Sequence, residues 1–194
     1  MEGAAAAKPF YENRWLGDPS WISSTGQVGV RGYARQQGYV LLSIDPATGK
    51  ETTLAGTDPR TPYDSPRWSL DGKSMLVIRR SDMRPDGSYT YDLLVGPSND
   101  LSQLKAIFST QEYIRTPRFS PDGRVILFNL PLRENSQRCP TWAIPADGSR
   151  EPCLVDHRAD STNSPELSPD GQYLLAARDY GLHRLKLGGT DNGR

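Results

Sequence analysis

Short apolar runs alternate with polar turn segments along this chain. Three of the runs, Met75–Ile78, Val125–Phe128 and Tyr173–Ala177, each follow a turn that contains glycine. Apolar runs of this length between turn signals indicate buried β-strands. The chain has no sustained apolar stripe with a 3.6-residue period, so the pattern predicts an all-β protein with little helix.

The turns before these runs repeat one octapeptide. Ser65–Gly72 reads Ser-Pro-Arg-Trp-Ser-Leu-Asp-Gly, near-copies lie at Thr116–Gly123 and Ser164–Gly171, and a degenerate copy lies at Asp18–Gly26. The turn glycines stand at positions 26, 72, 123 and 171, so successive copies are 46, 51 and 48 residues apart. Such a period indicates a repeat protein.

The octapeptide has the chemistry of a turn. Proline presets φ, aspartate accepts hydrogen bonds from nearby backbone N–H groups, and glycine adopts a positive φ. We therefore expect structural roles for the turn residues Asp71, Gly72, Asp122, Gly123, Asp170 and Gly171. The large residue before each turn recurs at one position, and we expect it to pack between neighbouring repeats; it is Trp21, Trp68, Phe119 and Leu167.

Each of the first three repeats also has a second turn between two further strands, at 45–49, 96–100 and 145–149. Four antiparallel strands joined by hairpins form one blade of a β-propeller, so we expect a propeller of four blades with four strands each. The repeats predict a single domain at 8–190 between flexible ends at 1–7 and 191–194. Its expected blades are about 18–56, 64–110, 115–157 and 163–190 together with 8–17.

Segment 8–17 enters the last blade because that blade lacks a strand. The residues after its third strand, Leu182–Leu187, are polar and rich in glycine, whereas 8–17 contains Phe10, Tyr11 and Trp15. Pairing of this segment in the last blade would close the ring and remove two open edges. Two alternatives remain: the blades belong to a six- to eight-bladed ring of a longer protein, or two chains pair their open ends.

The octapeptides resemble the Ser-Pro-Asp-Gly repeat of the TolB-like propellers, over about 18–187. The resemblance implies a propeller fold. Such propellers occur as periplasmic protein-binding modules, gating domains beside serine peptidases, sensor halves of signalling proteins and, occasionally, lyases. Familiar members usually have six blades, whereas this chain has room for four. The resemblance therefore implies a fold, and the function has to come from a site.

The charge balance and the absence of known catalytic motifs argue against several classes of function. Lys plus Arg equals Asp plus Glu at 23 each, which gives no reason to expect a nucleic-acid partner, and no apolar run is long enough for membrane insertion. The two histidines, His157 and His183, lack any partner motif, and neither a Gly-x-Ser-x-Gly elbow nor a phosphate-binding loop occurs. We therefore expect a non-enzymatic protein without cofactor or metal. A natural start at Met1 would indicate the cytoplasm, and a removed signal peptide the periplasm or another extracytoplasmic space.

The two hairpin turns of each blade should lie on one face of the ring and the remaining loops on the other. Arg and Tyr gather in these loops, and both are favoured at recognition surfaces, although capping of exposed strand ends would explain them equally. The candidate binding residues are Arg14, Arg35, Tyr63, Arg80, Tyr113, Arg115, Arg133, Arg158, Arg178 and Tyr180.

These residues favour a protein or peptide partner. One alternative is a small-molecule or anion site in the central channel, as in a sensor or a lyase-like enzyme. Another is a fragment of a larger multi-blade sensor, and self-association is also open. Cys139 and Cys153 fall on expected neighbouring strands of the third repeat, where either a disulfide or two half-buried thiols fits the sequence.

Overall fold

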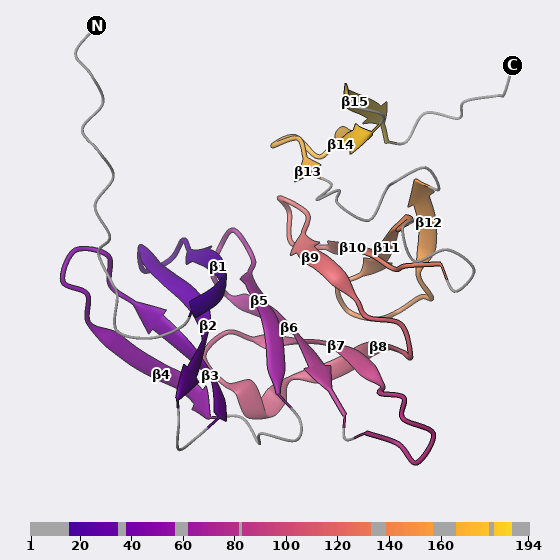
Figure 1. The fold of residues 1–194 in the computed structure, drawn as a ribbon. Coiled ribbons are helices and arrows are strands. Elements are labelled where there is room, and N and C mark those ends of the chain that lie inside the picture. Colours follow the sequence, from indigo (N-terminus) through magenta and orange to yellow (C-terminus); the bar gives the residue numbers. More distant parts are fainter. Residues whose placement is uncertain are drawn as a thin grey trace, which may run out of the picture.

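The computed structural model describes residues 16–34, 38–56, 62–81, 83–132, 139–156, 166–178 and 181–187. Within these ranges the chain forms strands and one short 3-10 helix, η1 (Leu101–Gln103), grouped into four antiparallel sheets that follow one another in chain order (Figure 1). The first sheet consists of β1 (Leu16–Ile22), β2 (Gln27–Ala34), β3 (Gly38–Ile44) and β4 (Glu51–Gly56). The second consists of β5 (Tyr63–Trp68), β6 (Ser74–Arg80), β7 (Tyr91–Pro97) and β8 (Lys105–Thr110).

The third sheet repeats this arrangement, and the fourth has three strands within the described residues. The third consists of β9 (Arg115–Phe119), β10 (Val125–Asn129), β11 (Thr141–Pro145) and β12 (Cys153–Asp156). The fourth consists of β13 (Glu166–Leu167), β14 (Tyr173–Arg178) and β15 (Gly181–Lys186). In every sheet each strand pairs with the next strand along the chain. The all-β, propeller-like architecture predicted by the repeats is therefore confirmed.

Segment 8–17 was expected to close the ring. Its residues 8–15 lie outside the described ranges, and its last two residues, Leu16 and Gly17, are described. Leu16 and Gly17 belong to β1, where they pair with Gly32 and Arg31 of β2. These two residues therefore extend the first sheet. Across the described residues the four sheets form an open series, with the first and last sheets at opposite ends (Figure 1).

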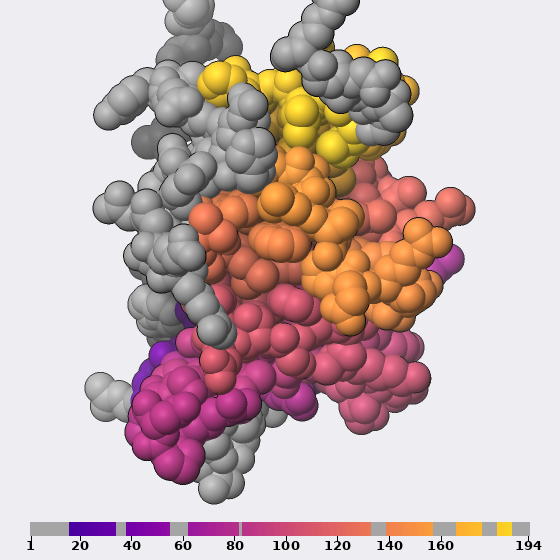
Figure 2. Space-filling model, turned by 90° about the vertical axis from the view of Figure 1, so that its right-hand side faces the viewer, coloured from indigo at the N-terminus to yellow at the C-terminus, as the bar shows by residue number. Residues whose placement is uncertain are grey.

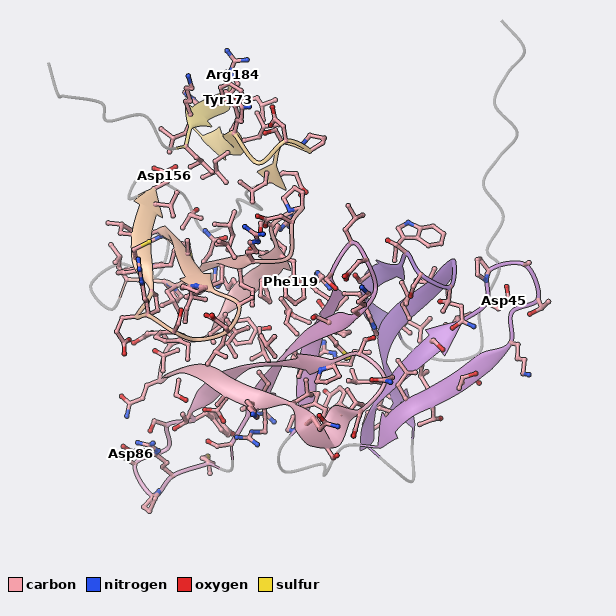
Figure 3. The ribbon with its side chains drawn as sticks, turned by 180° about the vertical axis from the view of Figure 1, so that it is seen from behind. Asp45, Asp86, Phe119, Asp156, Tyr173 and Arg184 are labelled. Carbon is pink, nitrogen blue, oxygen red and sulfur yellow. The ribbon has the colours of Figure 1, made fainter. Side chains whose placement is uncertain are left out.

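Consecutive sheets contact each other through their first strands, β1 with β5 and β5 with β9. The second, third and fourth sheets lie one above the other in chain order (Figure 2). An ion pair between Arg118 of β9 and Glu166 of β13 continues the series to the last sheet. On that sheet the Arg184 guanidinium lies 4.6 Å from the centre of the Tyr173 ring (Figure 3).

The first strands of the first three sheets, β1, β5 and β9, carry the same β-bulge, at the residue before a proline. Asp18, Ser65 and Thr116 have φ values of 55°, 47° and 46°, and the strand register shifts by one residue at each of them. A left-handed conformation in a residue other than glycine costs about 1–3 kcal/mol and persists only where the surrounding structure requires it. In the first two sheets the polar network described below forms at this bulge.

The hydrophobic core lies mainly between sheets. One cluster joins the second and third sheets and contains Ile78, Leu93, Ile126 and Phe128. A second cluster joins the first and second sheets through Leu41, Trp68 and other residues. The runs at Met75–Ile78 and Ile126–Phe128 are buried, as their apolar sequence predicted.

Two of the large residues before the turns pack between sheets, as expected. Trp68 belongs to the cluster between the first two sheets, and Phe119 packs against the next cluster. Trp21 is 63% exposed, so the expectation was wrong at this position. Trp21 lies in the first strand of the series, and no described sheet precedes it to cover the ring.

The Ser-x-Asp-Gly turns share one hydrogen-bond pattern. In the second sheet the Ser69 hydroxyl donates to Asp71 Oδ1 at 2.7 Å and accepts from the Ser74 N–H at 2.9 Å. Asp71 also accepts from the backbone N–H of Lys73, and Gly72 has a φ of 69°. The hydrogen bonds from Lys73 and Ser69 lower the pKa of Asp71. The turns at 120–123 and 168–171 form the same bonds.

Gly29 of β2 gives the Trp68 ring room between the first two sheets. A Cβ atom at position 29 would lie 2.1 Å from two carbons of that ring. We expect Gly29→Val to lower the free energy of unfolding by about 1–3 kcal/mol, the usual effect of overpacking, as measured by urea denaturation. In a Trp68→Leu background, which opens this space, the further effect of Gly29→Val should shrink. Equal effects in both backgrounds would contradict this account.

Candidate functional site

The two hairpin turns of a sheet lie together, so every sheet has a turn end and a loop end. In the second sheet the Ser98 N–H donates to the carbonyl of Lys73, and the Ser98 hydroxyl donates to that of Gly72. The backbone part of this link recurs in the third sheet, where the Ala146 N–H donates to the carbonyl of Arg124, and in the fourth, where the Leu187 N–H donates to that of Gln172. The opposite ends hold the loops between second and third strands and the connections between sheets. We call this end of the molecule the loop face.

A pocket of about 90 Å³ opens on the loop face, between the first and second sheets. Its lining combines two arginines, one carboxylate and three tyrosines with a small apolar part. The lining residues are Arg31, Tyr39, Pro62, Asp64, Ile78, Arg80, Tyr91 and Tyr113.

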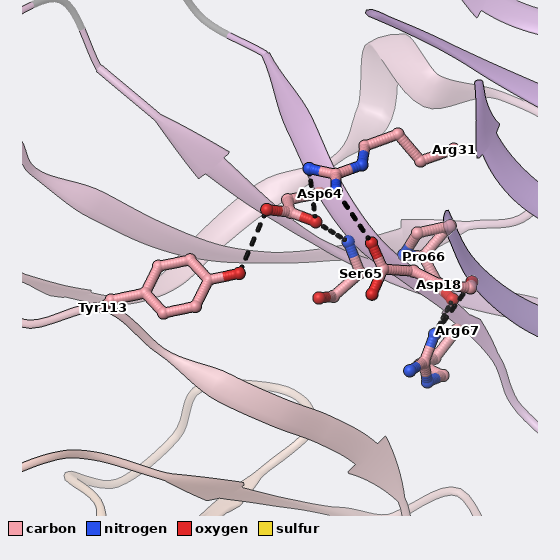
Figure 4. A network of polar contacts seen from close by, with 7 residues as sticks. All are labelled: Asp18, Arg31, Asp64, Ser65, Pro66, Arg67 and Tyr113. Atoms are coloured by element: carbon pink, nitrogen blue, oxygen red, sulfur yellow. Dashed lines mark hydrogen bonds and ion pairs between the residues drawn. The ribbon is translucent and has the colours of Figure 1, made fainter. Parts of the chain in front are cut away.

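Arg31 of β2 lies between two carboxylates, one from each of the first two sheets (Figure 4). Its Nη1 is 2.9 Å from Asp64 Oδ1, and its Nη2 is 3.3 Å from Asp18 Oδ2. Asp64 Oδ1 also accepts from the Ser65 N–H at 2.7 Å, and Asp64 Oδ2 accepts from the Tyr113 hydroxyl at 3.1 Å. These side chains come from β1, β2, β5 and the connection after β8. The network therefore ties the first two sheets together beside the pocket.

The backbone bulge also takes part. Arg67 Nη1 donates to the carbonyl oxygens of Asp18, at 3.2 Å, and of Pro66, at 2.8 Å (Figure 4). Burial lowers the pKa of Arg67, against the raising effect of Asp18 and Asp64, although an arginine remains charged. Arg67 thus holds the bulges of β1 and β5 against each other.

Burial and the two acids shift the pKa values of the network. The pKa of Asp18 is raised, first by burial and then by its hydrogen bond to Asp64 and the negative charge of that residue; Arg31 and Arg67 oppose the rise. Burial and the charge of Asp64 raise the pKa of Tyr113 to about 12. Tyr113 therefore keeps its proton near neutral pH and can donate it to Asp64.

Aromatic rings form the other wall of the pocket. The rings of Tyr91 and Tyr113 meet edge to face with centroids 5.3 Å apart, and Tyr89 lies beside Tyr91 at 6.4 Å. The Arg80 guanidinium lies 4.8 Å from the centre of the Tyr89 ring, and that of Arg31 lies 5.2 Å from the centre of Tyr39. Such cation–π contacts orient guanidinium groups on an aromatic surface.

The structure brings Arg80 and Tyr113 together, two of the residues that the sequence singled out. Tyr63 packs against the core cluster between the first two sheets, and Arg115 pairs with Asn129 across β9 and β10. Arg178 lies in β14, far along the series from the pocket. The other candidates, Arg14, Arg35, Arg133, Arg158 and Tyr180, lie outside the described residues.

Sequence reasoning missed Arg31, Tyr39, Tyr91 and Asp18. One signal was visible: an acid stands at position 18, where the aligned repeats have the hydroxyl residues Ser65 and Thr116. Arg31, Tyr39 and Tyr91 lie inside strands, where nothing in the local sequence distinguishes them from other strand residues.

The two cysteines are free thiols, Cys139 buried and Cys153 exposed. Cys153 pairs with Ala143 across β11 and β12. Ala143 is four residues from Cys139, which is about 13 Å along an extended chain. A disulfide needs Cα atoms within about 7 Å, so the register excludes the disulfide that the sequence left open.

A larger cavity, of about 500 Å³, lies at the turn end between the third and fourth sheets. Its lining is mainly apolar and includes Val125, Leu127, Leu167 and Leu187. The acids that reach it, Asp122 and Asp170, already accept hydrogen bonds within their own turns. This cavity therefore presents fewer polar groups that a ligand could bind than the pocket on the loop face does.

The described residues contain no group of three or more His, Cys, Asp and Glu side chains that could hold a metal ion. His183 is exposed on β15, and His157 lies outside the described ranges. Among the parts of the chain that the structure describes, no helix has the length and apolar character needed to cross a bilayer.

No known protein family model matches the chain, and no curated protein sequence matches it. Several solved structures are similar to it in fold. The fold is similar to that of TolB from Acinetobacter baumannii, with a TM-score of 0.63 and 17% identity over 88% of this chain and 40% of that one. A putative TolB from Agrobacterium tumefaciens gives a TM-score of 0.65 and 16% identity over 91% of this chain and 60% of that one.

An oligogalacturonate lyase from Vibrio parahaemolyticus gives a TM-score of 0.62 and 16% identity over 93% of this chain and 50% of that one. The chain thus spans between 40% and 60% of the length of these three proteins. The similarity supports a propeller fold like that of TolB. At these identities it says nothing of which residues act.

Proposed function

We propose that this chain is a non-catalytic binding module that recognises a protein or peptide through its loop face. The pocket between the first two sheets carries the proposal, because it places Arg80, Tyr91 and Tyr113 together on a rigid scaffold. Tyrosine and arginine dominate the binding energy of many protein interfaces. A site that is already ordered loses little conformational entropy on binding.

The state of the polar groups supports binding rather than catalysis. A general acid or base works best with a pKa near the operating pH. The pKa of Tyr113 is raised to about 12, and both oxygens of Asp64 already accept hydrogen bonds. These two residues therefore hold the site together and are not poised to transfer protons.

The size of the pocket supports a protein or peptide ligand. Sites for drug-sized molecules have volumes of roughly 300–1,000 Å³. The pocket, at about 90 Å³, accommodates a side chain or a chain end of a larger partner. The similar structures include an oligogalacturonate lyase, so the fold serves more than one function, and the proposal rests on the pocket.

The test is a selection of peptides from a random library on the intact chain, followed by affinity measurement with two variants. Tyr91→Leu removes the ring edge from the pocket, and we expect it to weaken a selected peptide by tenfold or more. Arg150→Ala, at an exposed arginine of the turn end, should leave the affinity unchanged. Thermal unfolding of both variants checks the fold. A failure to select any peptide, or equal effects of the two variants, would overturn the proposal.

A further inference from the structure

We propose that the loop-face pocket binds a carboxylate of the peptide through Arg80. This inference rests on the proposed function and names the group that is recognised. The carboxylate is either the C-terminus of the peptide or an acidic side chain, since the two offer the same pair of oxygens.

Arg80 differs from the other arginines around it. Arg31 pairs with Asp18 and Asp64, and Arg79 donates from Nε and Nη2 to Asp92, at 3.1 and 2.7 Å. Arg80 has no carboxylate partner among the described residues. Its Nε is buried and donates no hydrogen bond there, although the side chain lines the pocket. A charged donor group without an acceptor is unfavourable, so a ligand oxygen that comes within hydrogen-bond distance of the Arg80 guanidinium would stabilise it.

The one acid that lines the pocket already has partners for both of its oxygens. Asp64 lines the pocket, but its Oδ1 pairs with Arg31 and accepts from the Ser65 N–H, and its Oδ2 accepts from Tyr113. The repulsion that Asp64 exerts on an anion is therefore offset by Arg31. The charge of Arg80 remains available to the ligand, and the Tyr89 ring holds the guanidinium from one side.

A carboxylate fits this environment better than a phosphate. The guanidinium of arginine presents parallel donors that match the two oxygens of a planar carboxylate. A phosphate group is bulkier and brings up to two charges within reach of Asp64 and Asp18. The pocket is small, about 90 Å³, and tyrosine rings form much of its wall. These features together select a small, planar, singly charged group.

The first experiment follows the Nε–H signal of Arg80 by NMR on the intact chain, with Arg80→Lys used to identify it. Sodium acetate is titrated against sodium chloride at equal ionic strength. We expect acetate to shift the Arg80 signal with saturation and to leave the paired Arg79 signal in place. A shift that chloride reproduces, or no saturable shift, would overturn the inference.

The second experiment uses a peptide from the selection above. Its C-terminal amide and its Glu→Gln or Asp→Asn forms are compared with the parent. One of these changes should weaken binding about 10- to 100-fold, the range for a hydrogen bond to a charged group, and thereby identify the source of the carboxylate. The same change should have little effect on binding to Arg80→Gln, whereas Arg150→Gln should behave as the wild type.

The two experiments separate the failure of the inference from that of the proposed function. Peptides that bind equally well in all neutralised forms would overturn carboxylate recognition and leave peptide binding intact. A saturable acetate shift in a chain that selects no peptide would support the anion site and overturn the peptide function. Thermal unfolding of Arg80→Gln shows that any loss of binding comes from the site.

Discussion

Replacing Phe128 with alanine should lower the free energy of unfolding by about 3–5 kcal/mol, the usual range for a buried phenylalanine. The Phe128 side chain is fully buried, and its ring centroid lies 5.4 Å from that of Phe108. It belongs to the cluster that joins the second and third sheets, so its removal leaves a cavity between sheets. Urea denaturation followed by circular dichroism measures the change.

Leu154→Ala is the matched control, because Leu154 lies in the same sheet and is 49% exposed. We expect it to cost less than about 1 kcal/mol. Similar losses in the two variants would contradict the placement of the core. A second transition in Phe128→Ala would mean that the sheets no longer unfold as one cooperative unit.

Arg31→Met should destabilise the chain by about 3 kcal/mol at pH 8, because it leaves Asp18 and Asp64 facing each other without their shared cation. The methionine keeps much of the apolar volume of the arginine stem, so the effect reports on charge. Unfolding by urea at pH 5 and pH 8 measures it. Arg124→Met, at an exposed arginine of the turn end, should change stability little at either pH.

The pH dependence of Arg31→Met has a defined sign. Burial and Asp64 raise the pKa of Asp18 above its ordinary value of 3.8, and the charge of Arg31 opposes that rise. Without Arg31 the pKa of Asp18 should rise further. An acid whose pKa is raised in the folded state binds more protons there than in the unfolded chain, so stability falls as the pH rises from about 4 through the folded pKa. The deficit of Arg31→Met should therefore be larger at pH 8 than at pH 5, and an equal deficit would contradict the network.

Strands and turns were predictable from sequence because their chemistry is local. Ser69, Asp71 and Gly72 form their turn with one another and with the next strand, and the apolar run at Met75–Ile78 is buried as a unit. The pairing of Leu16 and Gly17 was not predictable in this way. Strand pairing depends on register with a distant segment, and these residues fit either the first sheet or a closing strand by composition alone.

The site was only partly predictable for a related reason. Arg80 stands out because it ends β6, and Tyr113 because it lies in the connection between β8 and β9, on the side where the loops gather. Asp18 reaches Arg31 from a bulge with a positive φ, and a residue before proline ordinarily favours extended backbone. No local sequence pattern predicts that bulge. Arg31 itself lies within a strand, and only the register of β1, β2 and β5 shows that it meets two acids.

The difference between the two cysteines makes the chain suited to labelling at one position. Burial raises the pKa of the Cys139 thiol, and the thiolate is the form that reacts with maleimides, so Cys139 should react slowly. Cys153 is exposed on β12, the outer strand of the third sheet, whereas the pocket lies between the first two sheets. A fluorophore attached there would leave the loop face open. Cys153 can therefore carry a dye without any added cysteine. The fluorescence anisotropy of that dye would report the binding of a partner.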